Sequence, residues 1–366
     1  MSNSPSDHRP SPALTAPQKP VHSASSERND YIDFLKGCLI FLVLWGHCIQ
    51  FVGYNNDRFW WDPVFKAIYM FHMPLFMAVS GYLCALRPNS SWRRLLSKRF
   101  QQWIVPMTAW LALQRLALVV ALLFALPSAK WHVVFRRLPD EWQNDIVFGY
   151  WFLWALFLAT ALVAFLQAIR RDGWPYLLVA CCLILFLPSG GIDLFKYTLP
   201  FYCLAYVAGR RSWPAVKGPW LLGLGLALSA ALYVYWKPQY YIYTSGMVLD
   251  RMHLGWIAYR WVAALVASGT FLLLAQQFFS RWQPLFVARL GRRTLDVYLL
   301  QFLFFPWLTQ RDFPLRNSAV FALAVAPVLA VGLAAGTVAL GRFLRRSSGV
   351  ARYLFGQLPR QDIHSL

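Results

Sequence analysis

The sequence of 366 residues contains few charged residues, and acidic residues are the scarcer of the two kinds. Charged residues make up 14% of the chain, and its 15 Asp and Glu are outnumbered by 35 Lys and Arg. Soluble globular domains carry about 25% charged residues. This shortage excludes an ordinary soluble domain as the main body of the chain.

Several common catalytic motifs are also missing. The sequence contains no P-loop, no dinucleotide-binding glycine pattern, no zinc-protease motif and no nucleophile elbow. Its six cysteines all lie in apolar runs, and none is spaced like a set of metal ligands or placed where a disulfide would form. We therefore expect no metal, and we interpret the cysteines as small core residues.

Long apolar runs dominate what is present, and hydrophobic residues make up 58% of the chain. A run of about 20 apolar residues is long enough to cross the ~30 Å hydrocarbon core of a bilayer. The pattern predicts an all-α fold, a polytopic integral membrane protein of about ten transmembrane helices. The expected spans are 34–54, 64–86, 103–126, 149–169, 176–190, 196–210, 219–236, 257–279, 294–310 and 318–341.

The net charge of +20 indicates how the chain is oriented in the membrane. Lys and Arg cluster in alternate connections between the spans, and with ten spans these connections share a side with the N-terminus. The positive-inside rule makes that side cytoplasmic, so both termini are predicted to be cytoplasmic and nucleic-acid binding is not expected. We divide the chain into a disordered cytosolic tail (1–30), a membrane-embedded domain (31–345) and a basic cytosolic tail (346–366).

The first apolar run contains a basic residue and a histidine eleven positions apart, Lys36 and His47. Eleven residues are close to three helical turns, so both side chains lie on one face, roughly 16 Å apart along the axis. Ionisable groups inside a membrane span are costly and usually mark a pathway or a reaction site. The first span is therefore the leading candidate for function.

A second histidine, His72, lies in the second apolar run. Counting 1.5 Å per residue from each end places His47 and His72 at similar depth, slightly beyond the middle of the membrane. Adjacent antiparallel spans pack side by side, so the two rings are predicted to line one cavity. Histidine suits proton transfer near neutral pH, although a structural hydrogen bond between helices is the alternative for each ring.

Cations near the cytosolic end suggest a place for an anionic ligand. Lys36 either holds such a ligand or pairs with Asp33 as an anchor of the helix end. The segment 91–100 reads as a basic amphipathic helix on the inner membrane surface, which grips either lipid headgroups or the phosphates of a cytosolic cofactor. Its basic residues are Arg93, Arg94, Lys98 and Arg99.

Two further groups are candidates for contact with a substrate. Ser80 and Gly81 are small, which allows either close helix packing or the passage of a ligand chain near the backbone. Trp151 and Trp154 belong to an aromatic cluster at the outer start of the fourth span, which either forms an aromatic belt or stacks on a sugar ring.

These residues resemble the membrane-bound acyltransferase-3 family, especially its fucose 4-O-acetylase-like branch. The resemblance rests on segments 33–37, 46–47, 71–76 and 80–82, supported by 98–106, 151–153 and 291–298. It implies an enzyme of about ten helices that moves an acyl group, usually acetyl from acetyl-CoA, to a sugar hydroxyl. His47 matches the family's essential histidine, and Lys36 occupies the position of its arginine. Gln301 stands where related proteins often have histidine.

The residues and the family that they resemble together predict an O-acetyltransferase of a bacterial inner membrane. The resemblance implies that acetyl-CoA is the donor and that the acceptor is an exopolysaccharide or its lipid-linked precursor, similar to enzymes of xanthan-type pathways. His47 and His72 are the catalytic candidates, with the basic residues holding the donor and Asp33, Ser80, Trp151 and Trp154 contacting substrate. The alternative is a non-enzymatic flippase or exporter of a lipid-linked saccharide.

Overall fold

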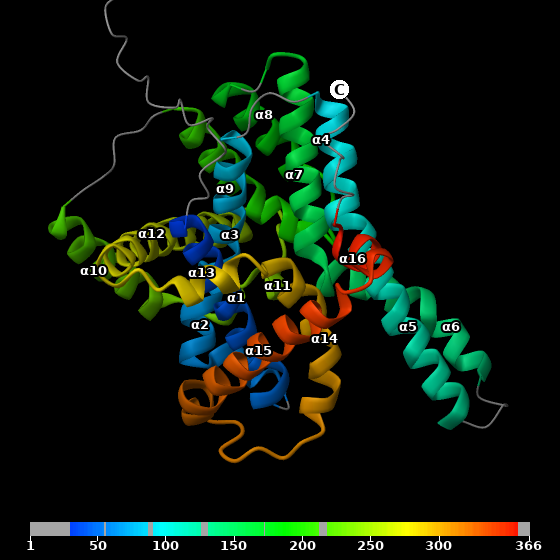
Figure 1. Cartoon of the computed structure of the whole chain (residues 1–366). Coiled ribbons are helices and arrows are strands. Elements are labelled where there is room, and N and C mark those ends of the chain that lie inside the picture. The colour runs from blue at the N-terminus through cyan, green and yellow to red at the C-terminus, as the bar shows by residue number, and fades with distance from the viewer. Residues whose placement is uncertain are drawn as a thin grey trace, which may run out of the picture.

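A computed structural model describes residues 30–54, 56–86, 91–125, 131–171, 173–211 and 218–357. Every regular element among them is a helix, which confirms the all-α prediction. Residues 1–29 of the predicted N-terminal tail and residues 358–366 of the predicted C-terminal tail lie outside the described residues. The α-helices are α1 (Asp30–His47), α2 (Pro63–Tyr69), α3 (His72–Ala85), α4 (Trp92–Arg99), α5 (Val105–Ala125), α6 (Trp131–Asn144), α7 (Trp151–Ala168), α8 (Trp174–Leu185), α9 (Asp193–Arg210), α10 (Pro219–Tyr235), α11 (Ile242–Ser245), α12 (Arg251–Trp282), α13 (Leu285–Gly291), α14 (Thr294–Thr309), α15 (Ala326–Leu344) and α16 (Ser348–Phe355) (Figure 1).

Short helices of other types connect several of these elements. Four have π-helical hydrogen bonding and two are 3₁₀ helices. The π-helical segments are η1 (Cys48–Gly53), η3 (Phe100–Ile104), η5 (Asp145–Gly149) and η7 (Phe321–Val325), and the 3₁₀ segments are η2 (Asp57–Trp61) and η6 (Pro238–Tyr240).

Each of the ten predicted spans corresponds to helix in the structure. Six helical segments are long and apolar enough to cross a membrane, namely those containing α1, α2–α3, α4–α5, α7, α12 and α15. Of the other four predicted spans, α8, α10 and α14 are apolar but shorter, and α9 carries Asp193, Lys196 and Arg210. The chain is a multi-pass membrane protein.

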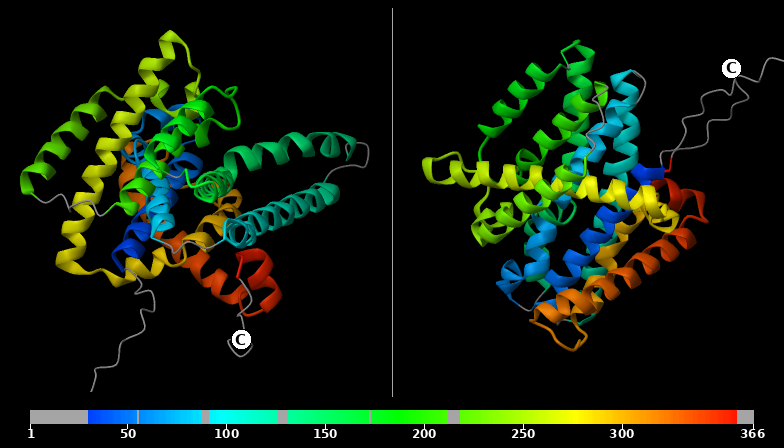
Figure 2. Two further views of the ribbon diagram at one scale, coloured as in Figure 1. Left: turned by 90° about the horizontal axis from the view of Figure 1, so that it is seen from above. Right: turned by 90° about the vertical axis from the view of Figure 1, so that its left-hand side faces the viewer.

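The region around α4 and α6 differs from what the sequence suggested. The basic helix α4 is not separate but runs through η3 into α5 as one helical segment, Trp92–Ala125. The following helix α6 lies outside every predicted span because its charged residues lower its hydropathy. Helices α5 and α6 form an antiparallel hairpin that projects from the body of the protein in Figures 1 and 2.

Close helix packing in the core depends on glycine at two positions. Helix α3 packs along α9, where a Cβ on Gly81 would lie 2.1 Å from the backbone oxygen of Tyr202. Helix α1 packs on α13, where a Cβ on Gly37 would lie 2.1 Å from the backbone oxygen of Val287. Both distances are far below van der Waals contact, so these helices approach as closely as they do because a side chain is missing.

Part of the predicted C-terminal tail is folded against the membrane domain. Helix α16 packs against α5, and the indole Nε1 of Trp110 donates a hydrogen bond to the backbone oxygen of Leu354 at 2.8 Å.

Candidate functional site

One face of α1 carries the residues that the sequence analysis singled out in the first span. Lys36, Ile40 and Val43 follow one another at intervals of three or four residues and line one cavity, and Val43 and His47 line a second. The π-helical segment η1 begins directly after His47. Such segments often occur at functional sites because the irregular turn re-aims the side chains around it.

A break in the second span determines where His72 lies. Helix α2 ends at Tyr69 and α3 begins at His72, because the ring of Pro74 would clash with the carbonyl of Met70 in a continuous helix. The backbone oxygen of Ile68 lies at the end of α2, and Nδ1 of His72 is 2.9 Å from it. The break therefore leaves His72 buried, with its ring against the last turn of α2.

Both histidines line a single cavity of about 600 Å³, which we call the histidine cavity. The prediction that the two rings share one cavity is confirmed. Aromatic and amide side chains dominate its walls. They include Trp60, Tyr69, Trp151, Tyr243 and Phe302 among the aromatic residues, and Gln50, Gln114 and Asn144 among the amides.

His47 is held by an amide and by aromatic rings. Its Nδ1 lies 2.9 Å from Oε1 of Gln301 on α14. The rings of Phe51, Phe302 and Phe305 have their centroids 5.4, 5.9 and 5.9 Å from the imidazole. The imidazole is therefore fixed on its Nδ1 side and enclosed by apolar rings.

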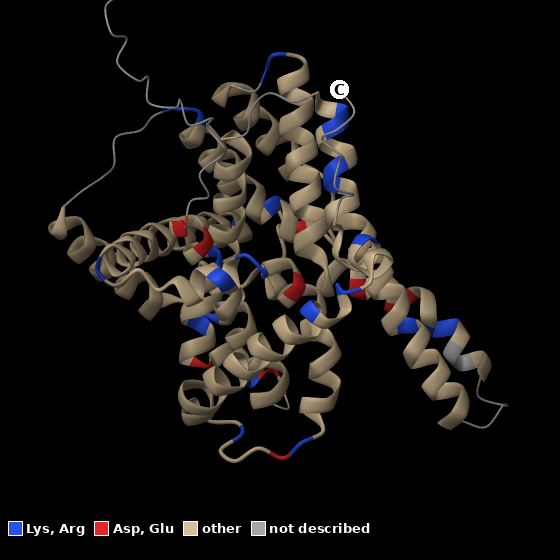
Figure 3. Cartoon of the chain, in the orientation of Figure 1, with Lys and Arg blue, Asp and Glu red and all other residues tan. Residues whose placement is uncertain are grey.

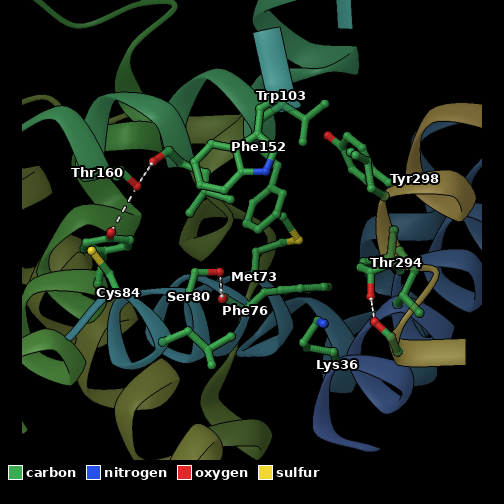
Figure 4. A pocket seen from close by; sticks show the side chains of 18 of the residues that line it. Lys36, Met73, Phe76, Ser80, Cys84, Trp103, Phe152, Thr160, Thr294 and Tyr298 are labelled. Atoms are coloured by element: carbon green, nitrogen blue, oxygen red, sulfur yellow. Dashed lines mark hydrogen bonds between the residues drawn. The ribbon is translucent and has the colours of Figure 1, made fainter. Parts of the chain in front are cut away.

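The second cavity, of about 260 Å³, contains three cations and is called the cation cavity below. Lys36, Arg99 and Arg292 line it. Figure 4 shows Lys36 and Thr294 at one end and Cys84 and Thr160 at the other, with Met73 and Phe76 between them. A cavity lined by both cations and apolar side chains suits a ligand that combines an anionic part with a narrow apolar one.

Asp33 forms ion pairs with two of these cations. Its Oδ1 lies 3.1 Å from Nζ of Lys36, and its Oδ2 lies 3.1 Å from Nε of Arg292. The hydrogen bond from Arg292 to Asp30, followed by that to Asp33, raises the pKa of the Arg292 guanidinium. Asp33 lines neither cavity, and its ion pairs match the interpretation of Asp33 and Lys36 as an anchor of the helix end. A contact between Asp33 and substrate stays a prediction.

Arg99 differs from the other two cations in its partners. It is 7% exposed, its guanidinium lies over the ring of Trp103 at 4.9 Å, and its Nη1 donates to the side-chain oxygen of Gln102. Within the described part of the chain it forms no ion pair with a carboxylate, and its Nε has no hydrogen-bond partner. A buried guanidinium without an anion is costly unless a ligand supplies one.

The remaining basic residues of α4 lie elsewhere. Arg93, Arg94 and Lys98 are exposed, and none of them lines the cation cavity. Figure 3 shows the basic residues of α4 as blue segments of its ribbon. The structure thus brings only Arg99 of this predicted group to the cavity. A role for the other three in holding the donor stays a prediction.

The two cavities adjoin at three residues. Val43, Met73 and Tyr298 line both of them. Tyr298 also joins α14 to the segment before α7, because its hydroxyl donates a hydrogen bond to the backbone oxygen of Gly149 at 3.2 Å. These three side chains therefore form the boundary between the two cavities.

The other predicted contact residues divide between the cavities and the helix packing. Ser80 lines the cation cavity, and its Oγ donates to the backbone oxygen of Phe76 at 2.9 Å (Figure 4). Trp151 lines the histidine cavity. Trp154 lines neither cavity, and its Nε1 donates to the backbone oxygen of Ile146 at 2.9 Å.

Sequence reasoning missed Arg292, Tyr298 and Trp103 as lining residues. Arg292 and Tyr298 lie in the late segment that carried part of the family resemblance, so that segment was the available signal. Nothing in the sequence around Trp103 distinguishes it from the other 17 tryptophans.

Comparisons with known proteins identify the family. A family model described as an acyltransferase domain, that of the acyltransferase-3 family, matches residues 29–341. The chain is 29% identical over 366 residues to the nodulation protein NolL of Mesorhizobium japonicum, covering 93% of this chain and 94% of the relative. It is 32% identical over 299 residues to the nodulation protein NolL of Sinorhizobium fredii, covering 76% and 78%. No solved structure matches the chain. The chain belongs to the acyltransferase-3 family of membrane-bound acyltransferases.

Proposed function

We propose that the protein is an O-acetyltransferase that moves acetyl from acetyl-CoA to a sugar hydroxyl of a bacterial exopolysaccharide or its lipid-linked precursor. The observation that carries the proposal is the pair of adjoining cavities, one with three cations and one with two histidines. Family membership favours an enzyme over the flippase or exporter that the sequence left open.

Acetyl-CoA suits the cation cavity. Its phosphates match guanidinium and ammonium groups, and its narrow pantetheine arm matches the apolar walls. Arg99 is the main candidate for a phosphate partner because it is buried without a carboxylate, whereas Lys36 pairs with Asp33 and Arg292 pairs with Asp30 and Asp33. By the positive-inside rule this cavity opens toward the cytosolic side of the inner membrane, and acetyl-CoA is made in the cytosol.

A saccharide suits the histidine cavity. Aromatic faces such as those of Trp60 and Trp151 pack on the apolar faces of sugar rings, and the amides of Gln50, Gln114 and Asn144 can pair with hydroxyl groups. A volume of about 600 Å³ lies within the usual range for a ligand site.

The reaction takes place where the cavities adjoin, near Met73 and Tyr298. The sugar oxygen attacks the thioester carbonyl, and His47 accepts the hydroxyl proton as the C–O bond forms. The C–S bond then breaks, coenzyme A leaves as the thiolate, and it takes the proton from the imidazolium. General-base assistance of this kind contributes about 10²- to 10⁴-fold to the rate.

O-acetyl content of surface polysaccharide, measured by proton NMR, tests the proposal. A deletion strain is complemented with wild type, with His47→Ala or with His253→Ala, at matched membrane levels. His253 lines neither cavity and is the control. We expect wild type and His253→Ala to restore acetylation and His47→Ala not to do so. Polymer yield that falls while acetyl per sugar is unchanged would instead identify a carrier.

A further inference from the structure

The side-chain amide of Gln301 has a fixed orientation. Its Nε2 lies 3.1 Å from the backbone oxygen of Tyr298, one turn earlier on α14, and Gln301 is fully buried. A backbone carbonyl only accepts hydrogen bonds, so the group that faces it must be the amide nitrogen. The amide oxygen is then the atom that faces α1.

This orientation determines which nitrogen of His47 carries the proton. Oε1 of Gln301 lies 2.9 Å from Nδ1 of His47, and an amide oxygen only accepts. Nδ1 must therefore be the donor. In a neutral imidazole the other nitrogen, Nε2, is then unprotonated and free to accept a proton.

We propose that Gln301 is a positioning residue that holds His47 in the tautomer with Nδ1 protonated and presents Nε2 as the base. The inference rests on the proposed function, in which His47 accepts the proton of the sugar hydroxyl. A neutral imidazole ring in the other tautomer would present an N–H where a lone pair is needed, and a ring without an Nδ1 partner could rotate.

The surroundings of His47 leave Gln301 as its fixed polar partner. The rings of Phe51, Phe302 and Phe305 pack around the imidazole and offer no strong acceptor. The titratable groups that share the cavity are His72 of α3, Tyr69 of α2, Tyr298 of α14, Tyr243 of α11, Tyr150 directly before α7 and Asp145 of η5.

One carboxylate also lines the histidine cavity in the described part of the chain, that of Asp145. It forms an ion pair with Arg115 of α5, which also pairs with Glu141. Among the described residues, the amide oxygen of Gln301 and not a carboxylate is the hydrogen-bond partner of Nδ1 of His47.

The neutrality of Gln301 has a chemical consequence. A carboxylate partner would stabilise the imidazolium, whereas an amide orients the ring without supplying charge. His47 would then remain unprotonated until the sugar hydroxyl gives up its proton, and it would return that proton readily to the leaving thiolate. The amide thus serves both proton transfers.

Two substitutions at position 301 separate this role from packing. Gln301→Leu keeps the approximate size and removes the acceptor. Gln301→Glu keeps an acceptor for Nδ1 of His47, adds a charge and gives up the amide N–H that donates to the Tyr298 oxygen. The control is Gln167→Leu, which removes an amide that donates to the hydroxyl of Tyr206 at 2.6 Å and lines neither cavity. Transfer of labelled acetyl from acetyl-CoA to the saccharide lipids of inverted host membrane vesicles is followed from pH 5 to 9.

We expect Gln301→Leu to lower kcat by at least about 100-fold with the KM for acetyl-CoA unchanged, the scale on which loss of an oriented base acts. Gln301→Glu should remain active, with the acidic limb of its pH–rate profile moved to higher pH, because a carboxylate favours the protonated ring. Gln167→Leu should behave like wild type in both respects.

The outcomes that contradict the inference differ from those that contradict the proposed function. If Gln301→Leu is as active as wild type, or if Gln301→Glu loses activity equally at every pH, Gln301 does not position the base. If wild-type vesicles transfer no acetyl, the proposed function itself fails. Where Gln301→Leu does not accumulate, the pH profile of Gln301→Glu decides the matter.

Discussion

Asp33 and Arg292 are 259 residues apart in the sequence and form an ion pair, with Oδ2 of Asp33 3.1 Å from Nε of Arg292. The other oxygen of Asp33 pairs with Lys36. One carboxylate therefore joins the start of α1 to the connection between α13 and α14, and it places two cations at the rim of the cation cavity.

Replacing Asp33 with Asn should lower the thermal stability of the protein. Lys36 would lose its carboxylate partner and Arg292 would keep only Asp30. Because Asp33 is buried but both cations are partly exposed, we expect a cost of about 1–2 kcal/mol. Thermal unfolding of the purified protein in detergent measures this change. Asp312→Asn is the control, because Asp312 is exposed and lies 3.9 Å from Arg316. Equal Tm values for the two variants would show that Asp33 does not hold these segments together.

Replacing Arg99 with Gln should weaken donor binding. A charge-assisted hydrogen bond contributes about 1.5–3 kcal/mol, so the KM for acetyl-CoA should rise about 10- to 100-fold. Lys98→Gln is the matched control, because it removes the same charge from the neighbouring residue, which is exposed and outside the cavity. A larger rise in KM for Lys98→Gln than for Arg99→Gln would place the donor on the outer face of α4 instead.

The sequence predicted the helices and the meeting of His47 with His72 because both follow from local patterns. Apolar runs determine the spans. A short connection makes two consecutive spans pack side by side, so residues at the same depth in the membrane lie close together. The cavity shared by the two histidines confirms this reasoning. The continuity of α4 with α5 was not predictable in the same way, because basic residues before an apolar run lower the hydropathy without ending the helix.

The partners of these residues could not be predicted from local patterns. Gln301 lies 254 positions from His47, and no periodicity relates two residues on helices so distant in sequence. Arg99 was one of four adjacent basic candidates, and only its position on the helix turned toward the cavity separates it from Lys98. Such choices depend on which helices pack together, which the apolar pattern alone does not determine.

Replacing Gly81 with Ala should destabilise the contact between α3 and α9. The new Cβ would lie 2.1 Å from the backbone oxygen of Tyr202, and overpacking of this kind costs about 1–3 kcal/mol. Gly223→Ala in α10 is the control, because a Cβ there meets nothing within 4 Å and Ala is the better helix former. Thermal unfolding should show a lower Tm for Gly81→Ala and an equal or higher one for Gly223→Ala. The reverse order would mean that α3 and α9 do not pack this closely.

Replacing His72 with Ala tests whether this histidine acts on substrate or only forms a hydrogen bond with the last turn of α2. Its Nδ1 is bound to the backbone oxygen of Ile68, which leaves the rest of the ring toward the cavity that it shares with His47. If His72 orients the acceptor, activity should fall about 10- to 100-fold, more than the loss of one neutral hydrogen bond explains. Acetyl transfer in vesicles and Tm are measured for the same preparations. His72→Asn, which offers a side-chain amide near the Ile68 oxygen, should recover Tm but not activity. Recovery of both by His72→Asn would show that the ring is structural and that His47 alone carries the proton.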